Sequence, residues 1–251
     1  MPGKRKAPAK PEVRPSKKPA KKKPIDLYFW PTPNGWKVSI MLEECRLPYN
    51  VIPVNIARGE QFTDAFLKIS PNNRMPAIVD HDGPGGRPIS VFESGAILQY
   101  LGRKTGRFYP SAERARVAVD EWLFWQMANL GPKSGEAGHY RRYAPEKIPY
   151  AINRYGDELN RLYGVMNTRL KARRFLAGAY SIADMASVGW IRHAERQGES
   201  FAEFPHLKRW LAEVRARSAA GRGMHLRVED AGKVDVTDPQ VRAVLFGQRA
   251  R

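Results

Sequence analysis

The chain has 251 residues, a formal net charge of +18 at pH 7, 42% hydrophobic residues and 10% aromatic residues. This length is sufficient for one large or two small domains with a buried core, and the lack of any run of 18 apolar residues argues against a membrane span. A single cysteine excludes an intramolecular disulfide framework and favours a cytoplasmic location. Neither this cysteine nor the five histidines have the spacing of metal ligands, so no metal is expected.

Residues 1–24 differ in composition from the rest of the chain. They contain ten Lys and Arg residues against one Glu, hold half of the net charge and include no aromatic residue. Such a segment cannot bury enough apolar surface to offset the entropy lost on ordering, which predicts a disordered tail. Two interpretations stay open: a weak, salt-sensitive contact with nucleic acid or another polyanion, or a solvated extension without a fixed partner.

From residue 25 the sequence alternates short strand-like runs with helical runs. Strands are predicted at 25–30, 49–56, 71–80 and 86–92, and helices at 34–47, 59–70 and 93–106, in the order β-α-β-α-β-β-α. Between the first strand and the first helix, the stretch FWPTPNG forms a short turn of the kind that often holds an anionic ligand group. A sulfur held there would belong to a ligand, because no cysteine lies in the turn.

Past a linker at 107–112 the sequence becomes helical throughout. Helices are predicted at 111–130, 149–172, 181–196 and 204–218, so residues 113–220 form an all-α domain after the α/β domain at 25–106. Residues 221–251 are polar and mixed, which predicts a C-terminal arm. Four apolar residues of this arm are candidates for docking on the body: Val241, Val244, Leu245 and Phe246.

Eight motifs in order accompany this arrangement: TPNG, GEQF, SPNNRMPAIVD, VFESGAILQYL, EWLFWQ, ANLGP, IPYAINRY and YSIAD. Together they resemble the cytosolic glutathione transferases, and within these the bacterial Nu class, which includes glutathione-dependent disulfide-bond oxidoreductases; the yeast prion nitrogen regulator has a related domain. The resemblance covers about residues 25–220. It implies a thioredoxin-like domain with a mixed four-stranded sheet that binds glutathione, an all-α C-terminal domain, and a homodimer.

The fourth strand ends at Glu93 and Ser94, where the next helix begins. As an N-cap, Ser94 would leave backbone N–H groups and a partial positive charge facing outward, which suits a carboxylate. The resemblance implies that this carboxylate is the α-carboxylate of the γ-glutamyl group of glutathione, with Glu93 accepting the neighbouring ammonium. On the residues alone, a plain helix cap is the alternative.

Further peptide-holding residues are implied by the resemblance. Met75–Pro76 is expected to be a cis peptide, which turns the Met75 backbone outward to pair with the cysteinyl backbone of glutathione. Gln61 matches a residue that contacts the glycyl end of the tripeptide. Arg154 matches an arginine that reaches glutathione from the helical domain, within the chain or across a dimer interface, and a solvated helix charge is the alternative.

The turn itself contains Thr32 and Asn34, which match the Thr and Asn that Nu-class enzymes place beside the sulfur. Thr32 can donate its hydroxyl to a thiolate and Asn34 its amide, whereas a proline-shaped turn with an Asn cap is the structural alternative. Tyr28 falls inside the first strand. Cys45 has helical spacing with Met41 and Leu42, which indicates core packing rather than catalysis.

The sizes of the expected effects on thiol reactivity favour one kind of reaction. Lowering a thiol pKa from about 8.5 to about 6.5 raises its thiolate fraction at pH 7 roughly 25-fold, but the weaker nucleophile loses about 8-fold of that gain. Most of the acceleration must therefore come from positioning two sulfurs in line. The preferred function is glutathione-dependent reduction of small disulfides, in which the ligands supply both sulfurs. The alternatives are conjugation of electrophiles and a non-catalytic glutathione-binding module that its basic tail tethers to nucleic acid.

Overall fold

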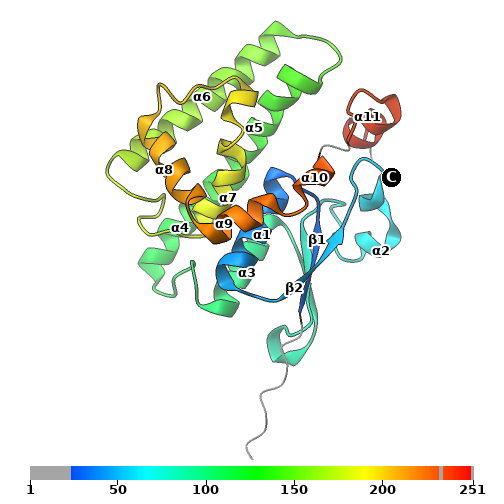
Figure 1. Ribbon diagram of the computed structural model, residues 1–251, viewed down its shortest axis with the longest axis vertical. Coiled ribbons are helices and arrows are strands. Elements are labelled where there is room, and N and C mark those ends of the chain that lie inside the picture. Colours follow the sequence, from blue (N-terminus) through cyan, green and yellow to red (C-terminus); the bar gives the residue numbers. More distant parts are fainter. Residues whose placement is uncertain (1–23, 232–233, 250–251) are drawn as a thin grey trace, which may run out of the picture.

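The computed structural model describes residues 24–231 and 234–249. It consists of a sheet domain and a larger helical domain that pack side by side (Figure 1). The disordered tail predicted for residues 1–24 lies outside the described residues, apart from Pro24. None of the described helices has both the length and the apolar character required to cross a membrane.

The sheet domain has four strands: β1 (Ile25–Phe29), β2 (Tyr49–Pro53), β3 (Ala77–Asp80) and β4 (Ile89–Phe92). Their order is β2-β1-β3-β4, with β1 parallel to β2 and antiparallel to β3, and with β3 antiparallel to β4. Helices α1 (Pro33–Cys45) and α3 (Ser94–Thr105) pack on one face of the sheet, and the short helix α2 (Asp64–Leu67) lies on the other (Figure 1). The predicted mixed sheet and its β-α-β-α-β-β-α order are confirmed.

The two faces of the sheet are held by different clusters. Apolar side chains of β1, β3, α1 and α3 merge with those of the helical domain into one continuous core. On the opposite face, Phe66 of α2 packs against Val54 and Ala77 in a separate small cluster. The shared core fixes the N-terminal ends of α1 and α3 against the helical domain, and these ends border the candidate site.

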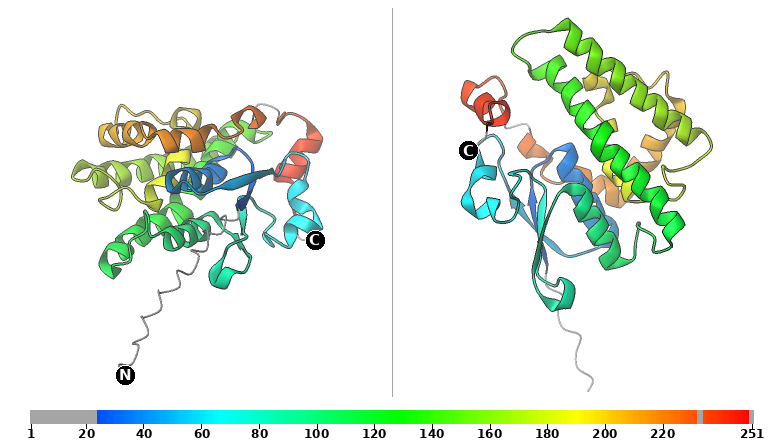
Figure 2. Two further views of the ribbon diagram at one scale, coloured as in Figure 1. Left: turned by 60° about the horizontal axis from the view of Figure 1, so that its bottom comes forward. Right: turned by 180° about the vertical axis from the view of Figure 1, so that it is seen from behind.

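The helical domain begins with a single long rod (Figure 2, right). Helix α4 (Glu113–Trp125) continues through the π-helical turn η3 (Gln126–Leu130) into α5 (Gly131–Gly138) and a second π-helical turn, η4 (His139–Tyr143). The sequence analysis ended this helix at residue 130, because Gly131–Pro132 is a typical helix stop. The wider π turn before Pro132 accommodates a residue without an N–H group, so the helix does not stop there.

The remaining helices are α6 (Pro149–Lys171), α7 (Ile182–Ile191), the short turn η5 (Ala194–Gln197), α8 (Pro205–Arg215), α9 (Ser218–His225), α10 (Val228–Ala231) and α11 (Pro239–Phe246). Helix α7 is buried along nearly its whole length, and Ser181 and Asp184 form a capping box at its start. The buried Asp184 also accepts hydrogen bonds from the Leu176 backbone and the Trp210 indole.

The segment after residue 220 is more closely attached than a free arm. Helix α9 crosses the expected boundary at 221 and packs on α1: a Cβ at Gly223 would lie 2.6 Å from the Ile40 backbone, and Ser39 donates a 2.7 Å hydrogen bond to the Gly223 carbonyl. The sequence analysis missed this contact because small residues carry no apolar signal. Helix α11 does dock, as its apolar residues predicted, with the Phe246 ring 4.9 Å from that of His139.

Candidate functional site

The turn after β1 is held open by two residues of the TPNG motif. Thr32 is the N-cap of α1, and its Oγ1 accepts a 3.3 Å hydrogen bond from the Gly35 N–H. A Cβ at Gly35 would lie 2.3 Å from the Trp30 carbonyl oxygen, so glycine is required for the chain to turn this tightly. Because the Thr32 oxygen acts as an acceptor in the cap, its O–H hydrogen remains available to an external acceptor.

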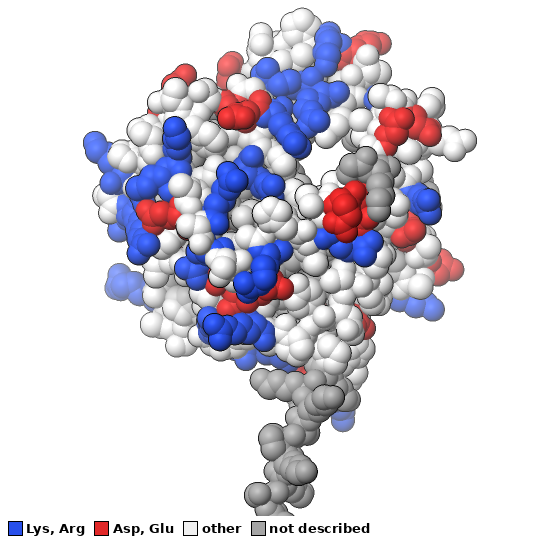
Figure 3. Space-filling model, viewed as in Figure 1, with Lys and Arg blue, Asp and Glu red and all other residues white. Residues whose placement is uncertain are grey.

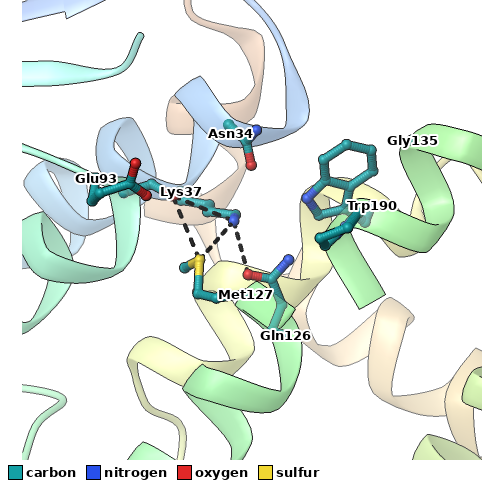
Figure 4. A pocket seen from close by; sticks show the side chains of 10 residues that line it. Asn34, Lys37, Glu93, Gln126, Met127, Gly135 and Trp190 are labelled. Carbon is teal, nitrogen blue, oxygen red and sulfur yellow. Dashed lines mark hydrogen bonds between the residues drawn. The ribbon is translucent and has the colours of Figure 1, made fainter. Parts of the chain in front are cut away.

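A cavity of about 260 Å³ lies between the sheet domain and the helical domain. Its lining from the sheet domain is Asn34, Lys37, Glu93 and Ser94, and from the helical domain Gln126, Met127, Gly131, Pro132, Gly135 and Trp190. Figure 4 shows Asn34, Lys37 and Glu93 on one side of this space and Gln126, Met127 and Trp190 on the other. The cavity thus brings together three residues that the sequence analysis selected, Asn34, Glu93 and Ser94.

The start of α3 differs in one detail from the expected cap. Glu93 occupies the N-cap position with a φ of 66°, and Ser94 is the first helical residue. The chain leaves β4 through this left-handed turn, which places the Glu93 carboxylate beside the cavity, where Asn72 donates a 3.3 Å hydrogen bond to it. The first N–H groups of a helix have no intrahelical partner, so the beginning of α3 remains suited to an anion.

Lys37 is a site residue that the sequence analysis missed. Its side chain is buried, and Nζ donates to Gln126 Oε1 at 2.8 Å, to Ser94 Oγ at 3.4 Å and to Met127 Sδ at 3.5 Å (Figure 4). Burial lowers the pKa of Lys37 to about 7, although the Glu93 carboxylate opposes part of this shift. The available signal was its position four residues before Met41, on the inward face of α1.

The cavity also has hydrogen-bond donors without partners. Within the part of the chain that the structure describes, Gln126 Nε2 and Trp190 Nε1 are buried and make no hydrogen bond. Both side chains line the cavity, and in Figure 4 the indole nitrogen of Trp190 faces the space beside Lys37. Buried donors are normally satisfied, so this lining suits a ligand rich in oxygen acceptors.

Met75 connects the cis peptide to the turn. The Met75–Pro76 bond is cis, as the resemblance implied, and Pro76 is buried. The Trp30 N–H donates to Met75 Sδ at 3.1 Å, which holds the segment before β3 against the end of β1. The Trp30 carbonyl also accepts a 2.8 Å hydrogen bond from the Thr32 N–H, so Trp30 links both residues, and neither Met75 nor Thr32 lines the cavity.

Three other residues lie away from the cavity. Gln61 is 2% exposed and donates to the Ile56 carbonyl at 3.2 Å, so its side chain holds its own loop. Arg154 lies on the exposed face of α6. Cys45 lies at the far end of α1, roughly 18 Å along the helix from Pro33; its Sγ is 3.9 Å from Met41 Sδ, and burial raises the pKa of the thiol.

The described residues contain no cluster of three or more His, Cys, Asp or Glu side chains arranged to hold a metal ion. The acidic and basic groups of the site instead come from single residues on separate elements. Glu93 precedes α3 and Lys37 lies in α1, with neutral side chains from η3 and α7 between the two domains. The arrangement suits a zwitterionic or peptide-like ligand with both a carboxylate and an ammonium group.

Comparison with known proteins agrees with this geometry. Residues 32–104 match the glutathione S-transferase N-terminal domain, and residues 151–218 match the glutathione S-transferase C-terminal domain. The disulfide-bond oxidoreductase YfcG of Escherichia coli is 50% identical over 202 residues, which are 80% of this chain and 94% of YfcG. The chain belongs to the glutathione S-transferase family.

Two solved structures of relatives contain ligands. A glutathione transferase from Burkholderia graminis, 40% identical with a TM-score of 0.78, has two glutathione molecules bound per subunit; the match covers 82% of this chain and 89% of that one. A glutathione transferase from Pseudomonas putida, 39% identical with a TM-score of 0.79, has one glutathione disulfide bound per subunit; the match covers 81% and 92% of the two chains.

Proposed function

We propose that this enzyme reduces small disulfides with glutathione by thiol–disulfide exchange, with no protein cysteine taking part. The observation that carries the proposal is the contrast between the turn after β1 and the position of Cys45. Asn34 of the turn lines the cavity and the Thr32 hydroxyl lies two residues before it, whereas the single thiol of the chain is half-buried at the other end of α1. The naming of YfcG as a disulfide-bond oxidoreductase supports the same chemistry.

In this proposal the two ends of glutathione are held by different elements. The α-carboxylate of the γ-glutamyl group binds at Ser94 and the first N–H groups of α3, and the ammonium binds the Glu93 carboxylate. The cysteinyl backbone pairs with the backbone of Met75, beside the cis bond to Pro76. The sulfur then lies at the turn, where Thr32 and Asn34 donate to the thiolate.

The reaction consists of two exchanges. The thiolate of one glutathione attacks a sulfur of the disulfide, the S–S bond breaks, and the departing thiolate takes a proton from solvent. A second glutathione thiolate attacks the glutathione sulfur of the mixed disulfide, which releases the second thiol and glutathione disulfide. Two glutathiones are oxidised for each disulfide reduced, and the site accelerates both steps by aligning the sulfurs.

Gln61 and Arg154 have less direct roles in this proposal. Gln61 maintains the loop that carries the glycyl end of glutathione, since its side chain holds that loop from within. Arg154 reaches glutathione only in a homodimer, across the subunit interface.

The basic N-terminal tail is assigned a separate, weak contact with a polyanion. Lys and Arg side chains are also spread over the helical domain on the face in Figure 3, which adds to the attraction of any polyanion near the tail. Retention on DNA at low salt, measured with and without residues 1–24, tests this contact. Unchanged retention after deletion would contradict it.

The main proposal is tested by steady-state turnover of a small glutathione mixed disulfide beside a chlorinated aromatic electrophile. We expect disulfide turnover to be the stronger activity, with formation of glutathione disulfide equal to the disulfide consumed. Turnover with the electrophile alone would make this a conjugating transferase. Glutathione binding without either activity would indicate a non-catalytic binding protein.

A further inference from the structure

Lys37 is buried, and its hydrogen-bond partners among the described residues are all neutral. Its Nζ contacts an amide oxygen, a hydroxyl and a thioether, from Gln126, Ser94 and Met127. Among residues 24–231 and 234–249 no carboxylate forms an ion pair with it, and Glu93 acts on it only through space. A buried ammonium without a counter-ion is strongly disfavoured, so a lysine in this position readily loses its proton.

The missing counter-ion would come from the ligand. Ser94 Oγ accepts from Lys37 at 3.4 Å, so a carboxylate that binds at Ser94 comes within about one further hydrogen-bond length of the ammonium. A carboxylate this close favours the charged form of lysine. The ligand ammonium is directed to Glu93, on the same side of the cavity as Lys37, and offsets only part of this effect because the carboxylate binds at Ser94, the residue that Lys37 contacts directly.

We propose that Lys37 is a proton-linked positioning residue, which takes up a proton when the α-carboxylate of glutathione binds at the start of α3. This inference rests on the proposed function, because it requires glutathione in this cavity. In the free protein the Lys37 pKa of about 7 leaves the amine largely neutral above neutral pH. In the complex the ammonium donates charge-assisted hydrogen bonds to Ser94 and Gln126, and thereby fixes the helical domain against the bound carboxylate.

The other side chains around Lys37 are neutral, apart from Glu93. Glu93 is the charged group that faces it from the β4–α3 turn. The η3 segment contributes the neutral side chains of Gln126 and Met127, and α7 contributes the neutral Trp190. Helix α1 adds the neutral Asn34 one turn earlier. Lys37 is therefore the group of the described site whose charge changes when a carboxylate arrives near neutral pH.

The test is calorimetric titration of the full chain with S-methylglutathione, which has no ionisable thiol. Titrations at pH 6 and pH 8 in two buffers of different ionisation enthalpy give the number of protons taken up on binding. Wild type is compared with Lys37→Met, which keeps the side-chain volume, and with Lys208→Met, a matched control at an exposed position of α8.

At pH 8 we expect wild type and Lys208→Met to take up at least about half a proton more per bound ligand than Lys37→Met. The wild-type uptake should be close to zero at pH 6, where the lysine is already charged. The affinity of wild type should consequently fall more steeply than that of Lys37→Met as pH rises from 7 to 9. Protons exchanged by the ligand amine are common to all three proteins and cancel in the comparison.

Equal proton uptake in wild type and Lys37→Met would overturn the inference and leave the proposed function intact. The wild-type profile is a second test that does not depend on the variant folding, since a proton uptake that is the same at pH 6 and pH 8 also overturns the inference. Failure of S-methylglutathione to bind the wild-type chain would overturn the proposed function together with the inference.

Discussion

The two ends of helix α1 carry opposite kinds of chemistry. At the N-terminal end, Thr32 and Asn34 offer hydrogen-bond donors beside a cavity, and Lys37 is buried one turn further on with neutral partners. At the C-terminal end, Cys45 packs against Met41, and burial raises the pKa of its thiol. In the proposed function, the end of α1 without a thiol is the one that holds the ligand sulfur. The lesson of this comparison for the proposal is that thiol chemistry here depends on donors and ligand placement rather than on a protein nucleophile.

The largest expected effect is on the pH dependence of stability and comes from Lys37, near the N-terminal end of α1. Because the pKa of Lys37 is about 7 in the folded chain and about 10.4 in an unfolded chain, the unfolded state binds more protons between these values. The wild-type free energy of unfolding should therefore rise with pH across this window by up to about 4 kcal/mol more than that of Lys37→Met. Chemical denaturation at pH 6.5 and 9.5 measures the difference, and parallel pH dependences in the two proteins would contradict the burial of this charge.

The second prediction concerns the tight turn before α1, on which the N-terminal end of the helix depends. A methyl group at Gly35 would meet the Trp30 carbonyl oxygen at 2.3 Å and the Phe29 ring at 2.9 Å, so Gly35→Ala should lower the free energy of unfolding by about 3 kcal/mol. It should also displace Thr32 and abolish most of the turnover. The matched control is Gly164→Ala in α6, where an added Cβ would have no atom within 4 Å apart from its own helix backbone. There we expect the free energy of unfolding to rise by about 0.5–1 kcal/mol. Thermal and urea unfolding distinguish the two, and equal stability changes would contradict this account of the turn.

The donors of the turn should affect catalysis more than stability. Thr32→Ala and Asn34→Ala each remove one donor from the thiolate, and we expect kcat/KM for the mixed disulfide to fall roughly 10- to 100-fold. Thr32→Ala should also cost about 1 kcal/mol of stability through the lost helix cap. Thr32→Ser keeps both the cap and the donor and should retain most of the turnover. Full activity in Thr32→Ala would remove the hydroxyl from the proposed mechanism.

The smallest effect concerns the other end of the helix. Because burial raises the pKa of Cys45, its thiol should react with an aromatic disulfide reagent several-fold more slowly than free glutathione at the same pH. Cys45→Ala should lower the free energy of unfolding by only about 1 kcal/mol, since the side chain is half-buried. A Cys45 thiol that reacts as fast as free glutathione would contradict the difference between the two ends of α1.

Local patterns predicted the sheet domain well. Alternating strands, the turn residues around Thr32 and the Glu93–Ser94 junction are encoded within a few residues, so β1, α1, β4 and α3 could be placed from the sequence. The long rod through Gly131–Pro132 could not, because a π turn depends on packing against other helices rather than on local propensity.

Long-range contacts limited what could be predicted of the site. The contact of Gly223 with Ile40 and the burial of Lys37 against Gln126 join residues far apart in the sequence. The sequence analysis did not select Lys37, and spacing alone could not show that a neutral amide from the helical domain would meet its amine. The orientation of Gln61 into its own loop likewise depends on a backbone conformation that the sequence pattern does not specify.

The most direct test of the central claim is disulfide turnover by Cys45→Ala beside Asn34→Ala, with glutathione and a small mixed disulfide. If the ligands supply both sulfurs, Cys45→Ala should turn over within about two-fold of wild type, while Asn34→Ala falls by roughly 10-fold or more. Loss of turnover in a folded Cys45→Ala protein, with Asn34→Ala still active, would contradict the claim and assign the reaction to the protein thiol.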